Sequence, residues 1–508
     1  MPAAPASPPP VGRALGGLVA LAVAVGVVAR FTTSSPLWLD EALTVDIARL
    51  PLSEIGPALR RDGHPPLYYW LLHGWTTLFG TGDLAVRALS GVLSVASLPL
   101  AWVVGRRRGG PELGAWAVVL VALCPFCVRY ATEARMYALV MALVLAGAVL
   151  VDDVVARGGR AAGAGLAAVT AALLWTHYWS LHLVAVVAAL LVLRAVRVPG
   201  DRAGARRALV ALGVGALAFL PWVPALADQL AHTGTPWAPP SRPAQVLAVT
   251  LDDLGGGGWA EARLLGVLSV VLALVGLCGT QTGATVVLGP RTRPALRPLA
   301  AVAAGTLALG SLVALAGSSA YASRYAAVVV PLALVVVAAG LVALPRGWPV
   351  ALAAGAWIVL AGIGIGHNAT VERTQADELA GRIAEDGGEP VVVVCPDQLG
   401  PSLDRALAAR GVAAEVLAYP TLDDGRFVDW RDYRARNDAA DPAERAAEIL
   451  DRAGGRDLWL VWSGAYRTFE GDCEALAHAL GSARPPEIVH GPADLFESAA
   501  LQLHPAPA

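Results

Sequence analysis

Long apolar stretches alternate with short polar connections over the first 367 residues of the chain. Most of the stretches hold about 17 to 23 residues, which is enough for a helix to cross the hydrocarbon core of a bilayer. The pattern therefore predicts a mainly α, polytopic bundle of about eleven membrane-spanning helices. The predicted helices cover residues 14–30, 84–105, 113–129, 133–151, 161–176, 180–196, 208–227, 263–288, 296–317, 321–343 and 347–366.

The pattern changes after the last apolar stretch, where charged residues become frequent and apolar runs become short. Residues 391–395 and 458–462 are short β-rich runs, and helical patterns alternate with them. The helical patterns cover residues 400–410, 441–453 and 469–480. We predict that residues 368–508 form a soluble α/β domain after a transmembrane domain of residues 13–367. The Pro/Ala-rich residues 1–12 are predicted to be a disordered tail.

Arginine residues collect in alternate connections between the predicted spans, which the positive-inside rule assigns to the cytoplasm. These connections hold Arg106 to Arg108, Arg157 and Arg160, the run from Arg194 to Arg207, Arg291 to Arg297, and Arg346. The N-terminus is then cytoplasmic, segment 14–30 is an uncleaved span, and an odd number of spans places residues 368–508 outside the cell membrane. Two long outer loops follow from this topology, at residues 32–83 and 228–262. Because the second loop is rich in proline and glycine, we expect it to be flexible.

Composition narrows the class of protein. Hydrophobic residues make up 56% of the chain and charged residues 15%, whereas soluble domains carry about 25% charged residues. The net charge of -2 gives no electrostatic footprint for nucleic acid. Cys124 and Cys127 have the spacing of a redox dithiol, but they lie at the end of an apolar stretch, which favours a packing role.

Ionisable side chains gather at the predicted outer ends of the spans rather than at the cytoplasmic ends. They are Asp40, Glu41, Asp62 and His64 in the first outer loop, Arg129, Glu133 and Arg135 between the third and fourth spans, His177 between the fifth and sixth, and Arg324 with Tyr325 at the start of the tenth. Charged groups near hydrocarbon are costly, so their convergence on one membrane level indicates a functional site.

Each of these residues also has an ordinary structural interpretation. Asp40 could cap a short helix that begins at Glu41, and Glu133 could complement the dipole of the fourth span. Arg129 and Glu133 are four residues apart and could simply pair, while Arg135 could extend to the interface. Joint participation of Glu133 and Arg135 requires a break in the helix near Thr132. His64 and His177 fit a loop or turn position as well as a site.

Six blocks, in a fixed order, resemble a known superfamily. They are LWLDEALT (37–44), HPPLYYWLLH (64–73), LAVRALS (84–90), RYATEARMYAL (129–139), THY (176–178) and SRY (323–325). The chain thereby resembles, from about residue 36 to 340, the GT-C glycosyltransferases related to protein O-mannosyltransferases and lipid A aminoarabinose transferases. The resemblance implies a GT-C bundle and a polyprenyl-phosphate-linked sugar donor, used at the outer face.

The resemblance also implies roles for individual residues. Asp40 would be the general base on the acceptor hydroxyl, with Glu41 in support. Donor phosphate and lipid would be bound by His64, Arg135, Arg324 and Tyr325. Supporting positions, and a divalent cation if one is used, would fall to Glu133, Asp62 and His177. This assignment agrees with the chemistry, because inverting displacement needs a carboxylate base and arginine suits a leaving phosphate.

The sequence therefore predicts a hexosyl or pentosyl transferase, with a hexose such as mannose as the sugar and a glycan, glycolipid or protein of the cell envelope as the acceptor. The chain departs from its relatives in lacking the large lumenal insertion of the mannosyltransferases. It also has Gly63-His64 where the aminoarabinose transferases have Glu-Lys. The alternatives are a lipid or sugar transporter (or flippase), and a non-catalytic glycolipid-binding protein. A transporter would show midplane charges or inverted repeats, and we find neither pattern in the sequence.

Overall fold

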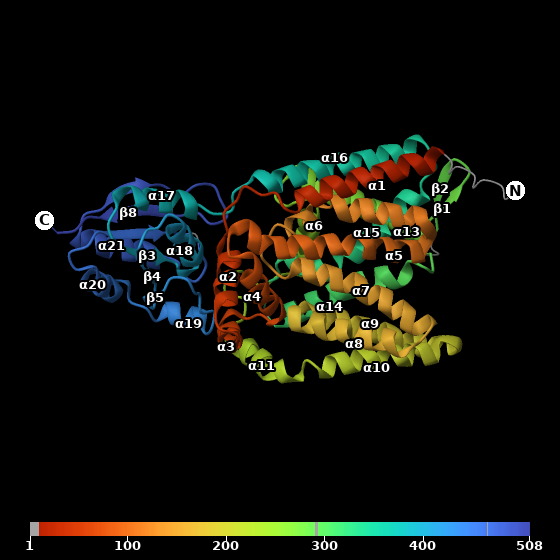
Figure 1. The fold of residues 1–508 in the computed structure, drawn as a ribbon, viewed down its shortest axis with the longest axis horizontal. Coiled ribbons are helices and arrows are strands. Elements are labelled where there is room, and N and C mark those ends of the chain that lie inside the picture. Colours follow the sequence, from red (N-terminus) through yellow and green to blue (C-terminus); the bar gives the residue numbers. More distant parts are fainter. Residues whose placement is uncertain (1–9, 290–292, 318, 465, 508) are drawn as a thin grey trace. The chain divides into compact units, whose positions relative to one another are not determined.

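The computed structural model describes residues 10–289, 293–317, 319–464 and 466–507 (Figure 1). Residues 1–9 of the predicted tail and Arg291 lie outside the described residues. The chain forms two compact units. The first, called the bundle unit, comprises residues 1–33, 87–221 and 240–369. The second, called the α/β unit, comprises residues 34–86, 222–239 and 370–508.

The bundle unit is made of apolar helices. They are α1 (Pro10–Ala29), most of α5 (Asp83–Leu123), α6 (Pro125–Arg129), α7 (Tyr137–Ala156), α8 (Arg160–Thr176), α9 (Trp179–Arg197), α10 (Arg202–Leu217), α12 (Pro243–Leu254), α13 (Ala260–Cys278), α14 (Arg297–Ala316), α15 (Val330–Ala343) and α16 (Trp348–Thr370). Within the described residues, seven helices are long and apolar enough to cross a membrane, and three shorter apolar helices accompany them. The chain is thus a multi-pass membrane protein, as predicted.

Helix α5 comprises two of the predicted spans. Gly109 and Gly110 have non-helical backbone angles inside it, with φ of 83° at Gly110. Positive φ is readily adopted only by glycine, so the chain can turn here while hydrogen bonding continues on either side. The turn follows Arg106 to Arg108, which separates the two apolar stretches in the sequence.

The core of the bundle is formed around α15, whose residues are almost all buried. Small residues allow α13 and α15 to approach closely. A Cβ atom at Gly340 would overlap the backbone oxygen of Leu272, and one at Gly276 would lie 2.5 Å from the oxygen of Val336. Close backbone contact through glycine is a common way for helices to pack in a bilayer, where the hydrophobic effect does not drive association.

Two sequence predictions for the segments between residues 228 and 288 were wrong. The predicted span 263–288 ends as a helix at Cys278, and a hairpin of β1 (Gly279–Thr282) and β2 (Thr285–Leu288) follows. Gly283 has φ of 60° at the turn and the strands hold Thr and Val, which favour extended structure. The predicted flexible loop 228–262 is largely helical, because it contains the end of α11 (Val223–His232) and all of α12.

The α/β unit contains a six-stranded sheet of order β5-β4-β3-β6-β8-β7. The strands are β3 (Val391–Cys395), β4 (Glu415–Ala418), β5 (Asp423–Asp424), β6 (Leu458–Trp462), β7 (Glu487–His490) and β8 (Ala500–His504). Strands β4, β3 and β6 are parallel, and β8 is antiparallel to β6. Strands β3 and β6 have the predicted bounds.

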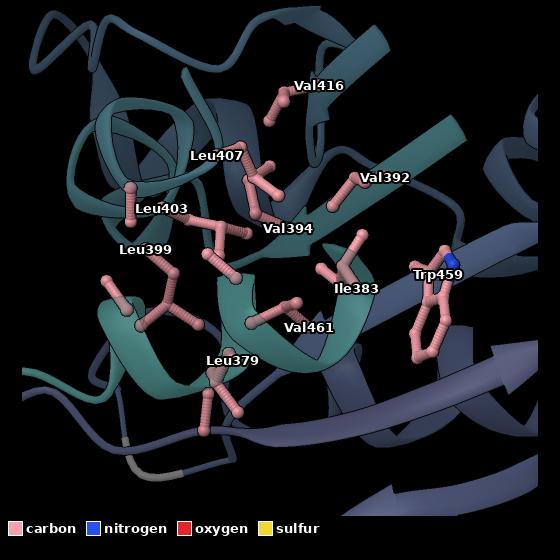
Figure 2. Close-up of a cluster of buried hydrophobic side chains, with 14 of the residues drawn as sticks. Leu379, Ile383, Val392, Val394, Leu399, Leu403, Leu407, Val416, Trp459 and Val461 are labelled. Carbon is pink, nitrogen blue, oxygen red and sulfur yellow. The ribbon is translucent and has the colours of Figure 1, made fainter. Parts of the chain in front are cut away.

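The other elements of this unit are helices, which come from residues 34–86, from residues 222–239 and from the C-terminal residues. They are α2 (Leu39–Arg49), α3 (Leu52–Asp62), α4 (Leu67–Phe79), α11, α17 (Ala376–Asp386), α18 (Gly400–Ala409), α19 (Tyr433–Asp438), α20 (Pro442–Ala453) and α21 (Asp472–Ala483). Helices α18, α20 and α21 confirm the predicted helical patterns. Figure 2 shows Leu379 and Ile383 of α17 packed with Val392, Val394 and Val461 of the sheet.

A disulfide joins Cys395, the last residue of β3, to Cys473 in α21. This bond could not be predicted from the sequence, because 78 residues separate the two cysteines. The closely spaced pair, Cys124 and Cys127, consists of buried free thiols. Cys124 donates to the oxygen of Leu254 at 3.7 Å and Cys127 lies 3.8 Å from the sulfur of Met141, so the two have packing partners of their own.

Candidate active site

The acidic pair lies in the first turn of α2, in the α/β unit. Helix α2 begins at Leu39, so Asp40 is its second residue and not its N-cap; the N-cap is Trp38, which makes no side-chain capping bond. The capping interpretation of Asp40 is therefore wrong. Asp40 is half-buried and Glu41 is buried. Both carboxylates are favoured at this end of the helix, because the helix dipole is positive there.

The first turn of α2 receives a hydrogen bond from far along the chain. The backbone amide of Leu39 donates to Oε1 of Glu497 at 2.5 Å. Glu497 is buried, and burial raises the pKa of its carboxyl to about 8. Glu497 was not predicted as a site residue, since the two partners are 458 residues apart and no local pattern marks Glu497.

Asp62 and His64 meet directly, as their spacing allows. Helix α3 ends at Asp62, and Gly63 then turns the chain with φ of 92°. Nδ1 of His64 lies 2.8 Å from Oδ2 of Asp62, and the hydroxyl of Tyr69 donates to the same oxygen at 2.9 Å. Asp62 is buried and His64 is half-buried. The carboxylate thus fixes the orientation of the imidazole and leaves Nε2 as its other polar atom.

In the bundle unit, residues 130–136 interrupt the helical structure between the third and fourth predicted spans. The site residues Glu133 and Arg135 lie in this break. Helix α6 ends at Arg129, the next residues form turns, and α7 begins only at Tyr137. The expected break near Thr132 is therefore present. Glu133 precedes α7 by four residues, so the interpretation that it complements the first turn of that helix is wrong.

Glu133 belongs to a buried charge cluster. Nε of Arg129 lies 3.5 Å from Oε1 of Glu133, which confirms the predicted pair, and Nη1 of Arg129 lies 3.1 Å from Oδ1 of Asp253. The hydroxyl of Tyr130 donates to Oδ2 of Asp253 at 2.7 Å. Burial, followed by the charge of Asp253, raises the pKa of Tyr130. Sequence reasoning missed Asp253, because it lies on α12 inside a segment predicted to be a loop.

Arg135 is held in the same break. It is 2% exposed, so the interpretation that it extends to the membrane interface is wrong. Its amide donates to the oxygen of Glu133 at 2.8 Å, and its own oxygen accepts from the hydroxyl of Ser90 on α5 at 3.0 Å. These backbone bonds fix the position from which its guanidinium extends.

Aromatic rings surround His177, which connects α8 to α9 and is buried. Its ring centroid lies 5.7 Å from that of Tyr137 and 5.2 Å from that of Tyr325. Nδ1 of His177 accepts from the amide of Trp179 at 3.2 Å, so Nε2 carries the proton in the neutral form. Arg324 and Tyr325 lie in a 3-10 helix, Ser323–Val328, that precedes α15 rather than beginning it.

The predicted site residues are divided between the two units. Asp40, Glu41, Asp62 and His64 belong to the α/β unit, and Glu133, Arg135, His177, Arg324 and Tyr325 belong to the bundle unit. Within the described residues there is no group of three or more His, Cys, Asp or Glu side chains arranged to hold a metal ion.

Comparison with known proteins identifies the fold. A sequence model of the family described as dolichyl-phosphate-mannose-protein mannosyltransferase matches residues 63–227. The structure is similar to that of ArnT from Cupriavidus metallidurans in the apo state. The TM-score is 0.63 at 15% identity, and the match covers 97% of this chain and 100% of that chain. ArnT from the same organism bound to undecaprenyl phosphate matches with a TM-score of 0.60 at 14% identity, over 97% of this chain and 99% of that chain.

Other GT-C proteins match less of their own length. The Archaeoglobus fulgidus oligosaccharyltransferase gives a TM-score of 0.50 at 12% identity, over 87% of this chain and 68% of that chain. The arabinofuranosyltransferase AftD from Mycobacteria gives 0.52 at 16% identity, over 96% and 41%. No curated protein matches the sequence. The matched family and the similar structures all belong to the GT-C glycosyltransferase superfamily, so the chain has the GT-C fold.

Proposed function

We propose that the chain is a membrane glycosyltransferase that moves a sugar from a polyprenyl-phosphate donor to a cell-envelope acceptor at the extracytoplasmic face. One observation carries the proposal. An acidic pair lies in the first turn of a buried helix, within a GT-C fold that aligns over 97% of the chain with ArnT bound to undecaprenyl phosphate. The resemblance of the six sequence blocks supports the same reaction.

In this reaction Asp40 removes the proton from the acceptor hydroxyl, whose oxygen then attacks the anomeric carbon of the donor sugar. The bond between that carbon and the phosphate oxygen breaks, and polyprenyl phosphate leaves with the bonding electrons. Configuration at the anomeric carbon is inverted. Glu41 supports the base, and a carboxylate base of this kind contributes about 10²–10⁴-fold in rate.

The leaving phosphate needs positive charge and hydrogen-bond donors. Arg135 and Arg324 supply guanidinium groups, whose planar fork of donors suits phosphate oxygens. Tyr325 and His177 lie in ring contact with each other in the bundle unit, which supports a role in shaping the donor site. His64, oriented by Asp62, adds an imidazole that positions the phosphate. Glu133 and Asp62 are also the acids that would assist a divalent cation if the reaction uses one.

The Cys395–Cys473 disulfide supports the orientation proposed for the C-terminal residues. Structural disulfides persist in oxidising compartments outside the cytoplasm. The arginine-rich connections support a cytoplasmic N-terminus by the positive-inside rule.

For the sugar, the mannosyltransferase family that matches residues 63–227 favours a hexose such as mannose. AftD is named for transfer of a pentose, so a pentose is the alternative. The acceptor is a glycan, a glycolipid or a protein.

The proposal is tested by replacing the base. Purified wild-type, Asp40→Asn and Asp46→Asn chains are assayed with polyprenyl-phosphate-linked mannose and arabinose, and products are identified by mass spectrometry. We expect Asp40→Asn to lose transfer by about 10²-fold or more, because the amide keeps the shape and removes the base.

Asp46→Asn is the matched control. Asp46 lies on the same helix, and burial raises its pKa to about 7, so an amide resembles the protonated form that Asp46 readily adopts near neutral pH. Retention of most activity in Asp40→Asn would contradict the assignment of the base. Absence of transfer from both donors by the wild-type chain would contradict the proposed function.

A further inference from the structure

Helix α2 begins at a contact with the C-terminal part of the chain. The amide of Leu39, the first residue of α2, donates to Oε1 of Glu497 at 2.5 Å. The first amides of a helix have no partner inside the helix and must be satisfied by another group. Trp38 provides no side-chain cap, so Glu497 supplies an acceptor that the local sequence does not.

Neighbouring contacts fix both sides of this bond. The hydroxyl of Ser35 accepts from the amide of Arg373 at 3.0 Å, and the ring of Trp38 meets that of Phe496 edge to face at a centroid distance of 5.3 Å. Glu497 itself is held by its backbone, since its amide donates to the oxygen of Arg373 at 2.8 Å. The segment before α2 is thus pinned to a pair of short segments in the C-terminal part of the same unit.

A neutral Glu497 side chain does not repel the carboxylate of Asp40, whose charge acts on it. Burial is the main cause that raises the pKa of Glu497 to about 8, and the charge of Asp40 raises it further. The Leu39 amide and the side chains of Thr374 and Ser402 act in the opposite direction. At neutral pH most chains therefore hold a proton on Glu497, and a protonated carboxyl still accepts the Leu39 amide through its carbonyl oxygen.

We infer that Glu497 is a positioning residue for the transfer reaction: it fixes the start of α2 and thereby the placement of Asp40 in the adjacent position. The inference rests on the proposed function, because it assigns a role relative to the catalytic base. It also gives the C-terminal part of the chain an indirect part in catalysis, through the placement of Asp40, which none of the six sequence blocks indicates.

The experiment compares Glu497→Ala with Glu497→Gln. Alanine removes the acceptor, whereas glutamine keeps a carbonyl oxygen in its place and resembles the protonated carboxyl. Displacement of a reacting group by about 1 Å can cost about 10²-fold in rate. We expect kcat of Glu497→Ala to fall by between about 10-fold and 10²-fold with little change in donor KM, and Glu497→Gln to restore most of the rate. Glu385→Ala is the matched control, since Glu385 is an exposed glutamate of the same unit.

A second measurement does not depend on activity. Hydrogen exchange followed by mass spectrometry reports the backbone of residues 37–44 in the full-length chain. We expect faster exchange there in Glu497→Ala and exchange near the wild-type rate in Glu497→Gln and Glu385→Ala. Faster exchange with an unchanged kcat would overturn the positioning role while leaving the proposed function intact. A wild-type chain without transferase activity would contradict the proposed function, whereas unchanged exchange in Glu497→Ala would contradict the cap itself.

A separate observation in the bundle unit carries a second inference. A cavity of about 310 Å³ lies among α7, α8, α9, α10 and α14. Its wall is apolar and includes Val144, Leu166, Leu183 and Leu212, and its charged lining residues are Arg108, Asp152, Arg194 and Arg297. An apolar space with a charged edge matches the shape of a lipid, in which an acyl chain adjoins a polar headgroup.

The charged edge lies far from the residues proposed to bind the donor phosphate. Arg194 is in the last turn of α9, whereas His177 precedes the first turn. Fifteen residues separate Arg194 from Trp179, which corresponds to roughly 22 Å along the helix axis. A donor whose phosphate is bound near His177 therefore cannot also place that phosphate beside Arg194.

The edge carries a net positive charge. The cavity lining holds three arginines, Arg108, Arg194 and Arg297, and one aspartate, Asp152, which pairs with Arg108 at 2.7 Å. Basic pockets between membrane helices bind anionic lipid headgroups. We propose that this cavity binds one acyl chain of an anionic phospholipid, with its headgroup at the arginine edge.

The test uses delipidated full-length protein and phosphatidylglycerol, with phosphatidylcholine as the neutral comparison. We expect phosphatidylglycerol to raise the Tm of the wild type and of Arg324→Ala, and to have a smaller effect on Arg297→Ala. Arg206→Ala, at an exposed position on α10, is the control. Equal stabilisation by both phospholipids, or an effect that Arg324→Ala abolishes and Arg297→Ala preserves, would overturn the proposal. The second result would instead indicate binding at the donor site.

Discussion

Asp40 of the α/β unit and Glu133 of the bundle unit are acidic site residues whose positions depend on different contacts. Glu133 meets Arg129, which lies four residues before it in the chain, and Asp253 of α12 completes the cluster. Asp40 lies in a helix whose first amide is satisfied by Glu497, 458 residues away from Leu39. The position of an acid in a clear sequence motif can therefore depend on a residue that no motif includes.

Among the changes considered, removal of residues 375–508 is expected to lower transfer most. These residues share a compact unit with residues 34–86, and they include Glu497. The truncated chain would expose the surface of α2 and lose its cap, so we expect transfer to fall by more than about 10²-fold. Transfer is measured in membranes beside the full-length chain. Limited proteolysis of residues 34–86 provides the structural control, and a truncated chain with normal activity would contradict the dependence.

Arg324→Ala is the next largest change and affects the bundle unit. A hydrogen bond to a charged group is worth about 1.5–3 kcal/mol, so we expect donor affinity to fall by about 10-fold to 10²-fold. Arg324→Lys should restore part of the loss, because lysine keeps the charge without the planar fork. Binding of a polyprenyl phosphate is measured by titration. Arg346→Ala, which removes an exposed arginine, is the control, and equal affinity in wild type and Arg324→Ala would contradict the phosphate role.

Asp253→Ala tests the cluster around Glu133. Arg129 and Tyr130 would each lose a partner at 3.1 Å and 2.7 Å, respectively. Because the Arg129 side chain is partly exposed, we expect a loss of about 1–3 kcal/mol in stability rather than the full cost of breaking a buried pair. Thermal unfolding in detergent measures it. Asp252→Ala removes the neighbouring carboxylate, whose partner Arg263 is exposed, and it should have a smaller effect. Equal Tm values for the two variants would show that the cluster adds little stability.

The pH dependence of stability provides a further test of the contact between α2 and Glu497. The pKa of Glu497 is raised to about 8 in the folded chain, whereas an unperturbed glutamate titrates at about 4.3. The folded chain retains this proton while the unfolded chain releases it. The contribution of Glu497 to stability is therefore complete below about pH 4.3 and is lost as the pH rises through about 8.

Glu497→Gln removes this titration and keeps the hydrogen-bond acceptor. We expect the Tm of this variant to change less with pH than that of the wild type between the two pKa values. Glu385→Gln, at an exposed glutamate, should follow the wild-type profile. Identical profiles for wild type and Glu497→Gln would indicate that Glu497 is ionised throughout this range.

The elements that depend on local composition could be predicted from the sequence alone. Apolar runs of sufficient length gave the helices of the bundle, and β-branched or aromatic runs gave β3 and β6 with their observed bounds. The spacing of four residues between Arg129 and Glu133 also suggested a pair that the structure contains. These features follow from the sequence because neighbouring residues are close together whatever the tertiary fold.

Contacts between distant segments depend on tertiary packing and could be seen only in the folded chain. Asp253 on α12, the Cys395–Cys473 disulfide and the bond from Leu39 to Glu497 each join residues from separate elements. The hairpin after Cys278 also differed from the prediction, because residues 279–288 contain Thr and Val, which favour strands, around a glycine turn. A single sequence carries no periodic signal for a contact across the fold, since such a contact depends on how the elements pack. The positioning of Asp40 by Glu497 is a contact of this kind.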